Sequence, residues 1–217
     1  MASHDTSSSP LHHMHEKALR DLTRSAASNI PGVDFASISV RHKKQTLQTV
    51  AASDPVAEQV DAVQYELHEG PCYAAVSGDR LVLVNDVKTT TDFPRFGARA
   101  SQLGVGAQLA IQLLHDGEQA GLNLYARQAG VFDLATIQMA ELFATQAAAT
   151  LEYATQVEQL GEALHSRTDI ATAVGIVMER YDIERENAFT FLVRHSNTMN
   201  IKLRALAQQV IAGTFKA

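Results

Sequence analysis

A long stretch without helix-breaking residues dominates the second half of the chain. No proline occurs after Pro94, and neither glycine nor proline interrupts the sequence between Asp133 and Gly161. Glycine and proline are the residues that most often weaken or end a helix, and aspartate is a favoured helix N-cap. The sequence therefore predicts one long helix that begins directly after Asp133.

A heptad-like apolar seam carries this helical pattern past Gly161. Its members alternate between spacings of three and four residues: Val157, Leu160, Leu164, Arg167, Ala171, Val174 and Met178. This spacing is typical of a two-stranded coiled coil, but an amphipathic helix that packs on its own domain has the same pattern. Arg167 argues against a purely apolar seam. The spacing alone leaves both interpretations open.

Strand-like alternation of apolar residues recurs before Asp133. Five segments show it: residues 35–40, 46–52, 81–84, 105–113 and 120–126. Asp116-Gly117 separates the last two segments and is a strong hairpin signal. Helical patterns lie before and between the strands, at residues 11–22, at residues 55–63 and in a short segment entered through Gly70-Pro71. We therefore predict an α+β domain whose antiparallel sheet has five or six strands and flanking helices.

Two short helical patterns end the chain, one over residues 188–193 and one over residues 203–210, before Gly213. Asn197 or Thr198 is the expected N-cap of the last helix. A polar row spaced by four residues is expected on that helix: Asn200, Arg204 and Gln208. These helices and the end of the long helix predict a small all-α module.

The composition limits the classes of function. The single cysteine, Cys72, excludes an intrachain disulfide, a multi-cysteine zinc site and a CxxC redox pair. No apolar run approaches the roughly 20 residues that a membrane span requires, and the N-terminus does not resemble a signal peptide. We expect a cytoplasmic protein with no membrane partner. The sequence predicts neither a metal site nor a cofactor.

The net charge of −6 is unevenly distributed. Residues 165–217 hold seven Lys or Arg and five Asp or Glu, which gives this segment +2 and leaves −8 on the remainder. Such an asymmetry is compatible with different partners for the two parts of the chain. It is also compatible with two ordinary solvated surfaces.

No catalytic motif is present, and we predict no catalytic residue. Gly104 and Gly106 lack the third glycine of a dinucleotide-binding loop. His68, Glu69 and Cys72 do not have the spacing of a zinc deaminase, and no second cysteine follows. The chain contains no GxSxG, HExxH or P-loop sequence.

A small-molecule pocket is the other kind of site that the sequence permits. Its candidate lining residues are Tyr65, Cys72, Phe96, Gln108, Asn123 and Tyr125. The same side chains could equally belong to routine core and edge packing. Cys72 is compatible with a reactive thiol at a helix N-terminus and with a buried small apolar residue.

Residues from about Gly32 to Leu151 resemble a GAF domain. The resemblance rests on four segments: Asp34–Val40, Gln64–Cys72, Val84–Asp86 and Leu122–Ala126. It implies a sensor built on a sheet of five or six strands, with an unknown small molecule as a possible ligand.

Leu164 through Ala212 resembles an ANTAR domain, the RNA-binding output of bacterial transcription antiterminators. The matching residues are Arg167–Ile170, Ala173–Arg180, Ala188, Phe189, Leu192, Ser196, Asn200 and Leu203–Ala207. The resemblance implies a homodimer formed through the helical region. It also implies binding to paired RNA hairpins in leader transcripts, which favours antitermination. Where the second helix of this module usually begins with a Ser-like cap, the chain has Glu184.

The combined interpretation divides the chain into four parts. These are a disordered N-terminus (1–10), a GAF-like sensor with its N-terminal helix (11–151), a linking helix (152–164) and an ANTAR module (165–217). Small residues, namely Ala173, Gly175 and Ala207, are expected to let the helices of this module approach closely.

Five residues are the RNA-binding candidates: Arg167, Arg180, Asn200, Lys202 and Arg204. The four cations can neutralise phosphates, and arginine can also stack on loop bases. Asn200 could read a base edge or cap a helix. Arg167 and Arg180 lie about 220° apart around one straight helix, so a single flat RNA surface cannot contact both unless the helix bends or a dimer supplies both faces.

Three function classes follow. The first is a signal-responsive regulator that binds leader RNA. The second is a small-molecule sensor whose helical tail docks a protein partner. The third is a GAF-type methionine sulfoxide reductase, which the single cysteine disfavours because that chemistry needs a resolving cysteine. We expect no enzyme activity.

Overall fold

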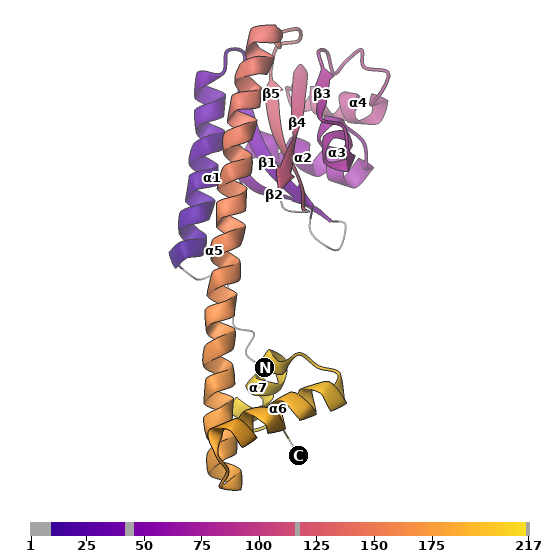
Figure 1. The fold of residues 1–217 in the computed structure, drawn as a ribbon. Coiled ribbons are helices and arrows are strands. Elements are labelled where there is room, and N and C mark those ends of the chain that lie inside the picture. Colours follow the sequence, from indigo (N-terminus) through magenta and orange to yellow (C-terminus); the bar gives the residue numbers. More distant parts are fainter. Residues whose placement is uncertain (1–9, 42–45, 116–117, 216–217) are drawn as a thin grey trace. The chain divides into compact units, whose positions relative to one another are not determined.

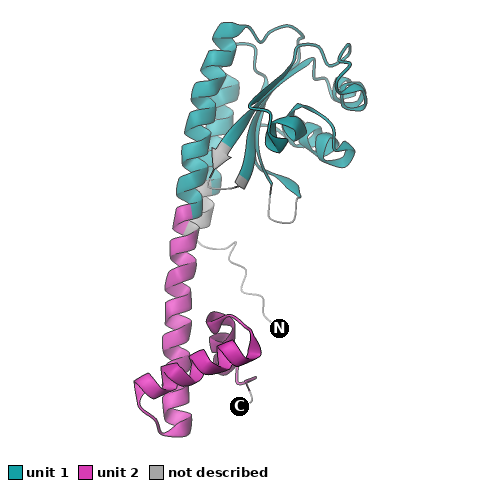
Figure 2. Ribbon diagram, turned by 45° about the vertical axis from the view of Figure 1, so that its right-hand side comes forward, with its two compact units in different colours: residues 1–155 teal, residues 156–217 magenta. Residues whose placement is uncertain are grey.

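A computed structural model describes residues 10–41, 46–115 and 118–215 (Figure 1). The chain divides into two compact units, residues 1–155 and residues 156–217 (Figure 2). The disordered segment expected over residues 1–10 lies outside the described residues except for Pro10. The same is true of the turn predicted at Asp116-Gly117.

The N-terminal unit is built on a five-stranded antiparallel sheet. Its strands are β1 (Phe35–Arg41), β2 (Leu47–Ala52), β3 (Leu81–Val84), β4 (Ala107–His115) and β5 (Glu118–Ala126). Their order across the sheet is β2-β1-β5-β4-β3. The hairpins predicted from the alternating segments are confirmed, since β1 pairs with β2 and β4 pairs with β5.

Helices cover both faces of this sheet (Figure 1). Helix α1 (Pro10–Asn29) and the first part of α5 pack on one face, against residues such as Ile38 and Leu122. The other face carries α2 (Pro55–Leu67), α3 (Pro71–Ser77) and α4 (Pro94–Gln102). Because strand side chains alternate between faces, Leu124 belongs to the first core and Tyr125 to the second.

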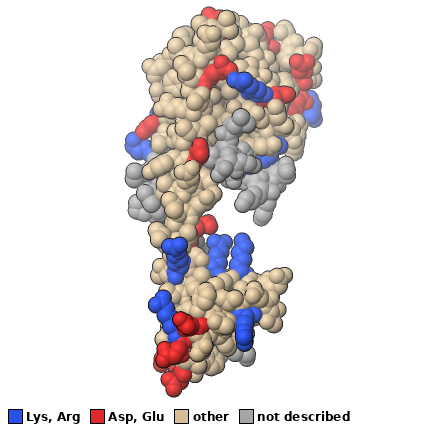
Figure 3. Space-filling model, viewed as in Figure 1, with Lys and Arg blue, Asp and Glu red and all other residues tan. Residues whose placement is uncertain are grey.

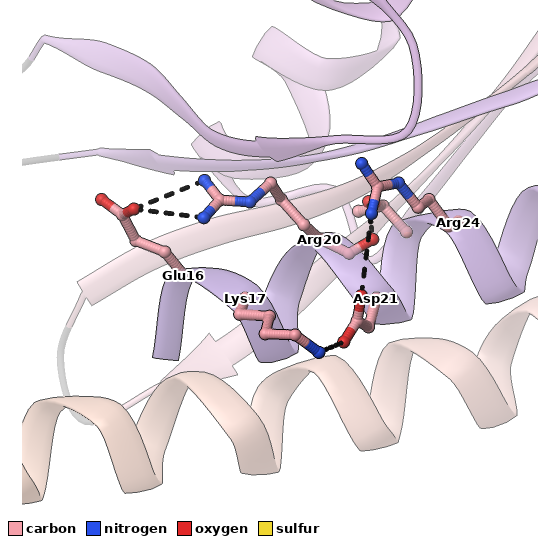
Figure 4. A network of polar contacts seen from close by, with 6 residues as sticks. Glu16, Lys17, Arg20, Asp21 and Arg24 are labelled. Atoms are coloured by element: carbon pink, nitrogen blue, oxygen red, sulfur yellow. Dashed lines mark hydrogen bonds and ion pairs between the residues drawn. The ribbon is translucent and has the colours of Figure 1, made fainter. Parts of the chain in front are cut away.

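Charged side chains one turn apart form ion pairs along the exposed side of α1 (Figure 4). Lys17 Nζ lies 2.6 Å from Asp21 Oδ2, and Arg24 contacts the other oxygen of the same carboxylate at 3.8 Å. The hydrogen bond from Lys17 lowers the pKa of Asp21. Arg20 and Glu16 form a second pair at 3.4 Å. Helix α1 is therefore amphipathic, with its apolar side on the sheet.

Helix α5 runs without a break from Leu134 to Tyr181, a length of 48 residues. Asp133 caps it as predicted, because its carboxylate accepts a hydrogen bond from the backbone N–H of Thr136 at 2.8 Å. That bond also lowers the pKa of Asp133. Gly161 lies inside the helix and does not end it. None of the described helices combines the length and the apolarity needed to cross a lipid bilayer.

The C-terminal unit packs α6 (Arg185–Met199) and α7 (Leu203–Ile211) on the last part of α5. The fully buried residues at the centre of its core are Ala173, Ala188, Leu192, Leu206 and Ala207. This confirms a long helix followed by a small helical module.

The expected caps of the last helix were wrong. Asn197 and Thr198 lie inside α6, and Lys202 is the residue that precedes α7. Asn200 is not part of α7 but ends α6, in the left-handed conformation with φ of 51°. Asparagine tolerates this conformation better than most residues. Glu184 stands at the N-cap of α6, and its side chain makes no capping hydrogen bond there.

The expected role of the small residues holds for two of the three. Ala173 and Ala207 are fully buried in the helical core. Gly175 is exposed, and a Cβ atom built on it would have nothing within 4 Å. Close helix approach therefore does not require glycine at this position.

Candidate functional site

Exposed Lys and Arg side chains of the C-terminal unit lie near the level at which α7 packs beside α5. Arg204 on α7 lies 3.4 Å from Glu162 on α5, and Gln208 donates to Asp169 at 3.2 Å. Helix α7 therefore runs alongside residues 162–169 of α5. Arg167 lies at this level but about 140° around α5 from Glu162, which contacts α7, and Lys202 directly precedes α7. We call the three exposed cations Arg167, Lys202 and Arg204 the basic end.

Carboxylates occupy the opposite end of the same unit. They surround the connection between α5 and α6, and all are exposed: Glu179, Asp182, Glu184 and Glu186. We call this group the acidic turn. Figure 3 shows Asp and Glu atoms gathered at the lower end of the unit, with Lys and Arg atoms mostly above them. Glu179 lies about 18 Å along α5 from Arg167, so an anionic partner is favoured at the basic end and repelled at the acidic turn.

The structure does not bring Arg180 together with the other predicted RNA-binding residues. Because α5 is continuous from Leu134 to Tyr181, Arg167 and Arg180 are separated by about 20 Å along the axis as well as by about 220° around it. Arg180 lies beside Glu179 and close in sequence to Asp182, in the acidic turn. The predicted set therefore divides into the basic end, with Asn200 near it in sequence, and an isolated Arg180.

Asn200 has a definite structural role. Its backbone N–H donates to the carbonyl oxygens of Ser196 and Asn197, and its conformation ends α6. Its side chain is exposed and lies two residues before Lys202. Capping uses the backbone and leaves the amide side chain available, so the two roles that the sequence left open do not exclude each other.

A second candidate site lies inside the N-terminal unit, between the sheet and helices α2 and α3. Polar side chains from six elements meet there in one hydrogen-bonded network, which we call the buried polar cluster: Ser37, Ser39, Thr49, Asp61, Gln64, Tyr65, Cys72, Gln108, Asn123 and Tyr125. Five of these were predicted as pocket residues: Tyr65, Cys72, Gln108, Asn123 and Tyr125. All five except Tyr65, which is half-buried, are fully buried.

Asp61 is the only carboxylate in the buried polar cluster. It accepts hydrogen bonds from Thr49 Oγ1 at 2.8 Å, from Asn123 Nδ2 at 3.3 Å and from the Tyr125 hydroxyl. No lysine or arginine among the described residues forms an ion pair with it. Burial therefore raises the pKa of Asp61 to about 6, although the hydroxyl donors oppose this shift.

Sequence reasoning missed Asp61 and Gln64. Both lie on the buried face of α2, at spacings of four and seven residues from the fully buried Ala57. A polar residue on an otherwise apolar helix face is the signal that could have found them. Phe96, the remaining predicted pocket residue, is buried instead in an apolar cluster with Val60 and Tyr125.

Two acceptors in the buried polar cluster have no hydrogen-bond partner among the described residues. They are Gln108 Oε1 and Asn123 Oδ1. The amide nitrogen of Asn123 is engaged by Ser37, Ser39 and Asp61, so a simple exchange of its oxygen and nitrogen would place an oxygen against a carboxylate. Unpartnered buried acceptors are uncommon in native proteins and are costly in free energy.

Cys72 is buried, and its environment disfavours the thiolate form. Its Sγ lies 3.4 Å from Ser39 Oγ, and burial raises the pKa of the thiol to about 12. We expect iodoacetamide to modify Cys72 at a negligible rate in the native protein near neutral pH, because the thiolate is the nucleophile. Mass spectrometry of timed reactions checks this, with the chain in denaturant as the positive control. Modification of the native protein as fast as of the denatured chain would contradict the buried placement.

Family models match most of the chain. A GAF domain model matches residues 13–152, and an ANTAR domain model matches residues 158–211. The chain is a GAF-ANTAR protein. We therefore refer to residues 1–155 as the GAF unit and to residues 156–217 as the ANTAR unit.

Solved structures resemble the GAF unit in fold. A GAF domain region from Geobacter sulfurreducens PCA is 20% identical with a TM-score of 0.55, and covers 66% of this chain and 96% of its own. The type II free methionine-R-sulfoxide reductase from Thermoplasma acidophilum is 17% identical with a TM-score of 0.53, and covers 66% and 96%. The GAF domain of an Acinetobacter phosphoenolpyruvate-protein phosphotransferase is 14% identical with a TM-score of 0.51, and covers 67% and 86%. Comparison with curated proteins gives no match.

The two domains are regulatory in kind. An ANTAR domain is an RNA-binding domain of the antitermination type, and a GAF domain is a sensory domain. Such domains are generally not enzymes. The GAF unit resembles a reductase in its fold alone, and this resemblance does not imply catalysis.

Proposed function

We propose that this GAF-ANTAR protein is a signal-responsive regulator that binds hairpins in leader transcripts and promotes transcription antitermination. The observation that carries the proposal is the basic end of the ANTAR unit, where three exposed cations lie on a domain of the RNA-binding antitermination type. The acidic turn at the other end of the unit gives the RNA one favoured orientation, because phosphates avoid it.

The charge of the ANTAR unit suggests how the RNA is held. Residues 165–217 of this unit carry only +2, and the whole unit over residues 156–217 has a net charge of zero, so phosphate neutralisation by one copy supplies a limited part of the affinity. Arginine planes can also stack on unpaired loop bases, and Arg167 and Arg204 are both exposed. We infer that loop bases and phosphates are contacted together, which favours hairpins over plain duplexes.

A mobility-shift assay with the full-length protein tests this function. The probe is an RNA with two tandem hairpins, and the control is an RNA in which the same stems form one continuous duplex without loops. We expect the hairpin RNA to bind more tightly, and its affinity to fall as salt rises. Equal binding of the duplex, or no binding to any tandem-hairpin leader, would overturn the proposal.

We further propose that the protein acts as a homodimer through the part of the α5 seam that precedes Arg167. Leu160 and Leu164 lie on this seam and are 65% and 63% exposed in the single chain. Two leucines one turn apart on an exposed helix face are typical of a coiled-coil contact. A second copy would bury both side chains and place a second basic end on the same RNA.

Replacement of Leu164 by glutamate is expected to disrupt this dimer, because the two seams would then bury like charges. Sedimentation velocity or native mass spectrometry of the full chain should show a shift from dimer to monomer. His165→Glu is the matched control, since His165 is exposed on the next position and lies off the seam. A dimer that is insensitive to Leu164→Glu would place the interface elsewhere.

We propose that the signal enters at the buried polar cluster of the GAF unit. The unpartnered Gln108 Oε1 and Asn123 Oδ1 support a small ligand that carries N–H or O–H donors. Asp61 adds an acceptor of negative charge at the same place. A ligand of this kind would satisfy groups that are otherwise costly to bury.

A further inference from the structure

Strand β3 forms one edge of the GAF sheet, and β4 is its only partner strand among the described residues (Figure 1). The backbone N–H of Gln112 donates to the carbonyl of Arg80 at 2.9 Å, and the register continues with Val82 opposite Ala110. In an antiparallel pair, alternate residues direct both backbone groups to the same neighbour. Leu81 and Leu83 therefore direct their N–H and C=O groups away from the sheet, and no partner for these groups exists among the described residues.

Apart from its short length, the β3 edge carries none of the usual protections against a further strand. Native edges are commonly blunted by a charged residue, a proline or a bulge within the strand. The β3 sequence is Leu81–Val84, four aliphatic residues, and the first three are half-buried. Its pairing with β4 shows a regular register. The strand is short, so a segment added to it would gain few backbone bonds and would depend on side-chain contacts for the rest of its affinity.

An acidic hollow adjoins the free edge. It has a volume of about 800 Å³ and lies between β3 and the segment Asp92-Phe93 that enters α4. Three carboxylates line it, those of Asp79, Asp92 and Glu141, against the single cation Arg80. Arg80 Nη2 lies 3.7 Å from Glu141 Oε1 and is largely exposed, which leaves Asp79 and Asp92 without an ion-pair partner among the described residues. The hollow therefore attracts positive charge.

We propose that the β3 edge and this hollow bind an extended, basic peptide segment of a partner protein, which adds to the GAF sheet as a sixth strand. Backbone bonds to Leu81 and Leu83 supply part of the affinity, and alternate side chains supply the specificity. Aliphatic side chains of the segment meet β3, and its lysine or arginine side chains meet Asp79, Asp92 and Glu141. This interaction goes beyond RNA recognition and involves none of the residues assigned to it.

Amide exchange followed by NMR on the full-length protein tests the geometry. The probe is a synthetic octapeptide of alternating lysine and valine. In the free protein, we expect the amides of Leu81 and Leu83 to exchange quickly and those of Val82 and Val84 to be protected. Addition of the peptide should protect Leu81 and Leu83. If addition of the peptide leaves the amides of Leu81 and Leu83 exchanging quickly, the proposal is overturned.

Two control peptides separate backbone pairing from charge. The first carries N-methyl groups on alternate amides and keeps every lysine, and the second has glutamate in place of lysine. Fluorescence anisotropy should show about tenfold weaker binding for either peptide. Equal binding of the N-methylated peptide would mean that the charged hollow alone attracts it, and this outcome would refute strand addition.

Two variants complete the test. Leu83→Pro removes an N–H that faces away from the sheet and is therefore compatible with an edge strand; it should reduce peptide binding about tenfold. Asp92→Lys changes only an exposed side chain and should weaken binding of the lysine peptide while it strengthens binding of the glutamate peptide. Circular dichroism confirms that each variant is folded. If Leu83→Pro instead lowered only self-association of the chain, the occupant would be a second copy and the proposal would fail.

Discussion

Replacement of Arg167 and Arg204 together by alanine is expected to weaken binding of tandem-hairpin RNA on the order of a hundredfold at about 0.1 M salt. Both side chains are exposed at the basic end. Arg204 faces Glu162 at 3.4 Å in the free protein, so an RNA phosphate replaces a weak, solvent-exposed ion pair and loses little by doing so. Each lost phosphate contact also lowers the slope of log affinity against log salt by about 0.9.

Fluorescence anisotropy across a salt series measures both effects. Arg185→Ala is the matched control, because it removes an exposed arginine of the same unit that lies next to Glu184 and Glu186 in the acidic turn. Arg180→Ala makes a sharper comparison, since sequence reasoning placed Arg180 in the RNA-binding set and the structure separates it from Arg167. We expect either single variant to change the affinity by less than about threefold. Unaltered hairpin affinity in the double variant would refute the assignment of the basic end.

The strands and the long helix were predictable because their apolar periodicity follows from backbone geometry alone. Alternation placed residues 105–113 and 120–126 in one hairpin, and the capping carboxylate of Asp133 marked the start of α5. The end of α6 was not predictable in this way. Ser196 is buried and donates to the carbonyl of Ile201 at 2.6 Å, a contact that exists only once the chain has turned. This turn extends α6 through Asn197 and leaves Asn200 as its cap.

The same distinction between local pattern and distant contact applies to the candidate sites. Asn123 and Tyr125 were both predicted as pocket residues, and they share a face of β5 because residues two apart on a strand do so. Asp61 was missed because aspartate on a helix is usually solvated, and its burial depends on donors from β2 and β5 that are distant in sequence. The separation of Arg180 from the basic end could be anticipated from helix geometry. Its place beside Glu179 and Asp182 is likewise given by their adjacency in the sequence.

Asp61→Asn is expected to stabilise the GAF unit at neutral pH and to leave its stability nearly unchanged in mild acid. The folded-state pKa of Asp61 is raised from 3.8 to about 6, so the folded protein binds this proton more tightly than the unfolded chain does. The stability from this group is complete below about pH 4 and is lost as pH rises through about 6. The loss amounts to roughly 3 kcal/mol above about pH 7.

Asparagine mimics the protonated side chain and removes this loss. Its oxygen can accept from the Tyr125 hydroxyl, and its nitrogen can donate to Thr49 Oγ1, which then donates to Tyr65. The other titratable groups beside Asp61 do not ionise in this range, because burial raises the pKa of Tyr65, Tyr125 and Cys72. Glu58 lies on the same helix, and its charge raises the pKa of Asp61 further.

Urea unfolding of the full-length protein between about pH 4.5 and about pH 7.5, followed by near-ultraviolet circular dichroism of the tyrosines, measures the effect. The difference in unfolding free energy between Asp61→Asn and the wild type should grow with pH across this window and become constant above it. Asp92→Asn removes an exposed carboxylate and should show no such trend. A difference that is independent of pH would mean that Asp61 does not titrate in the folded protein. A growing difference would show that the buried polar cluster holds its carboxylate at a cost that a donor-bearing ligand could relieve.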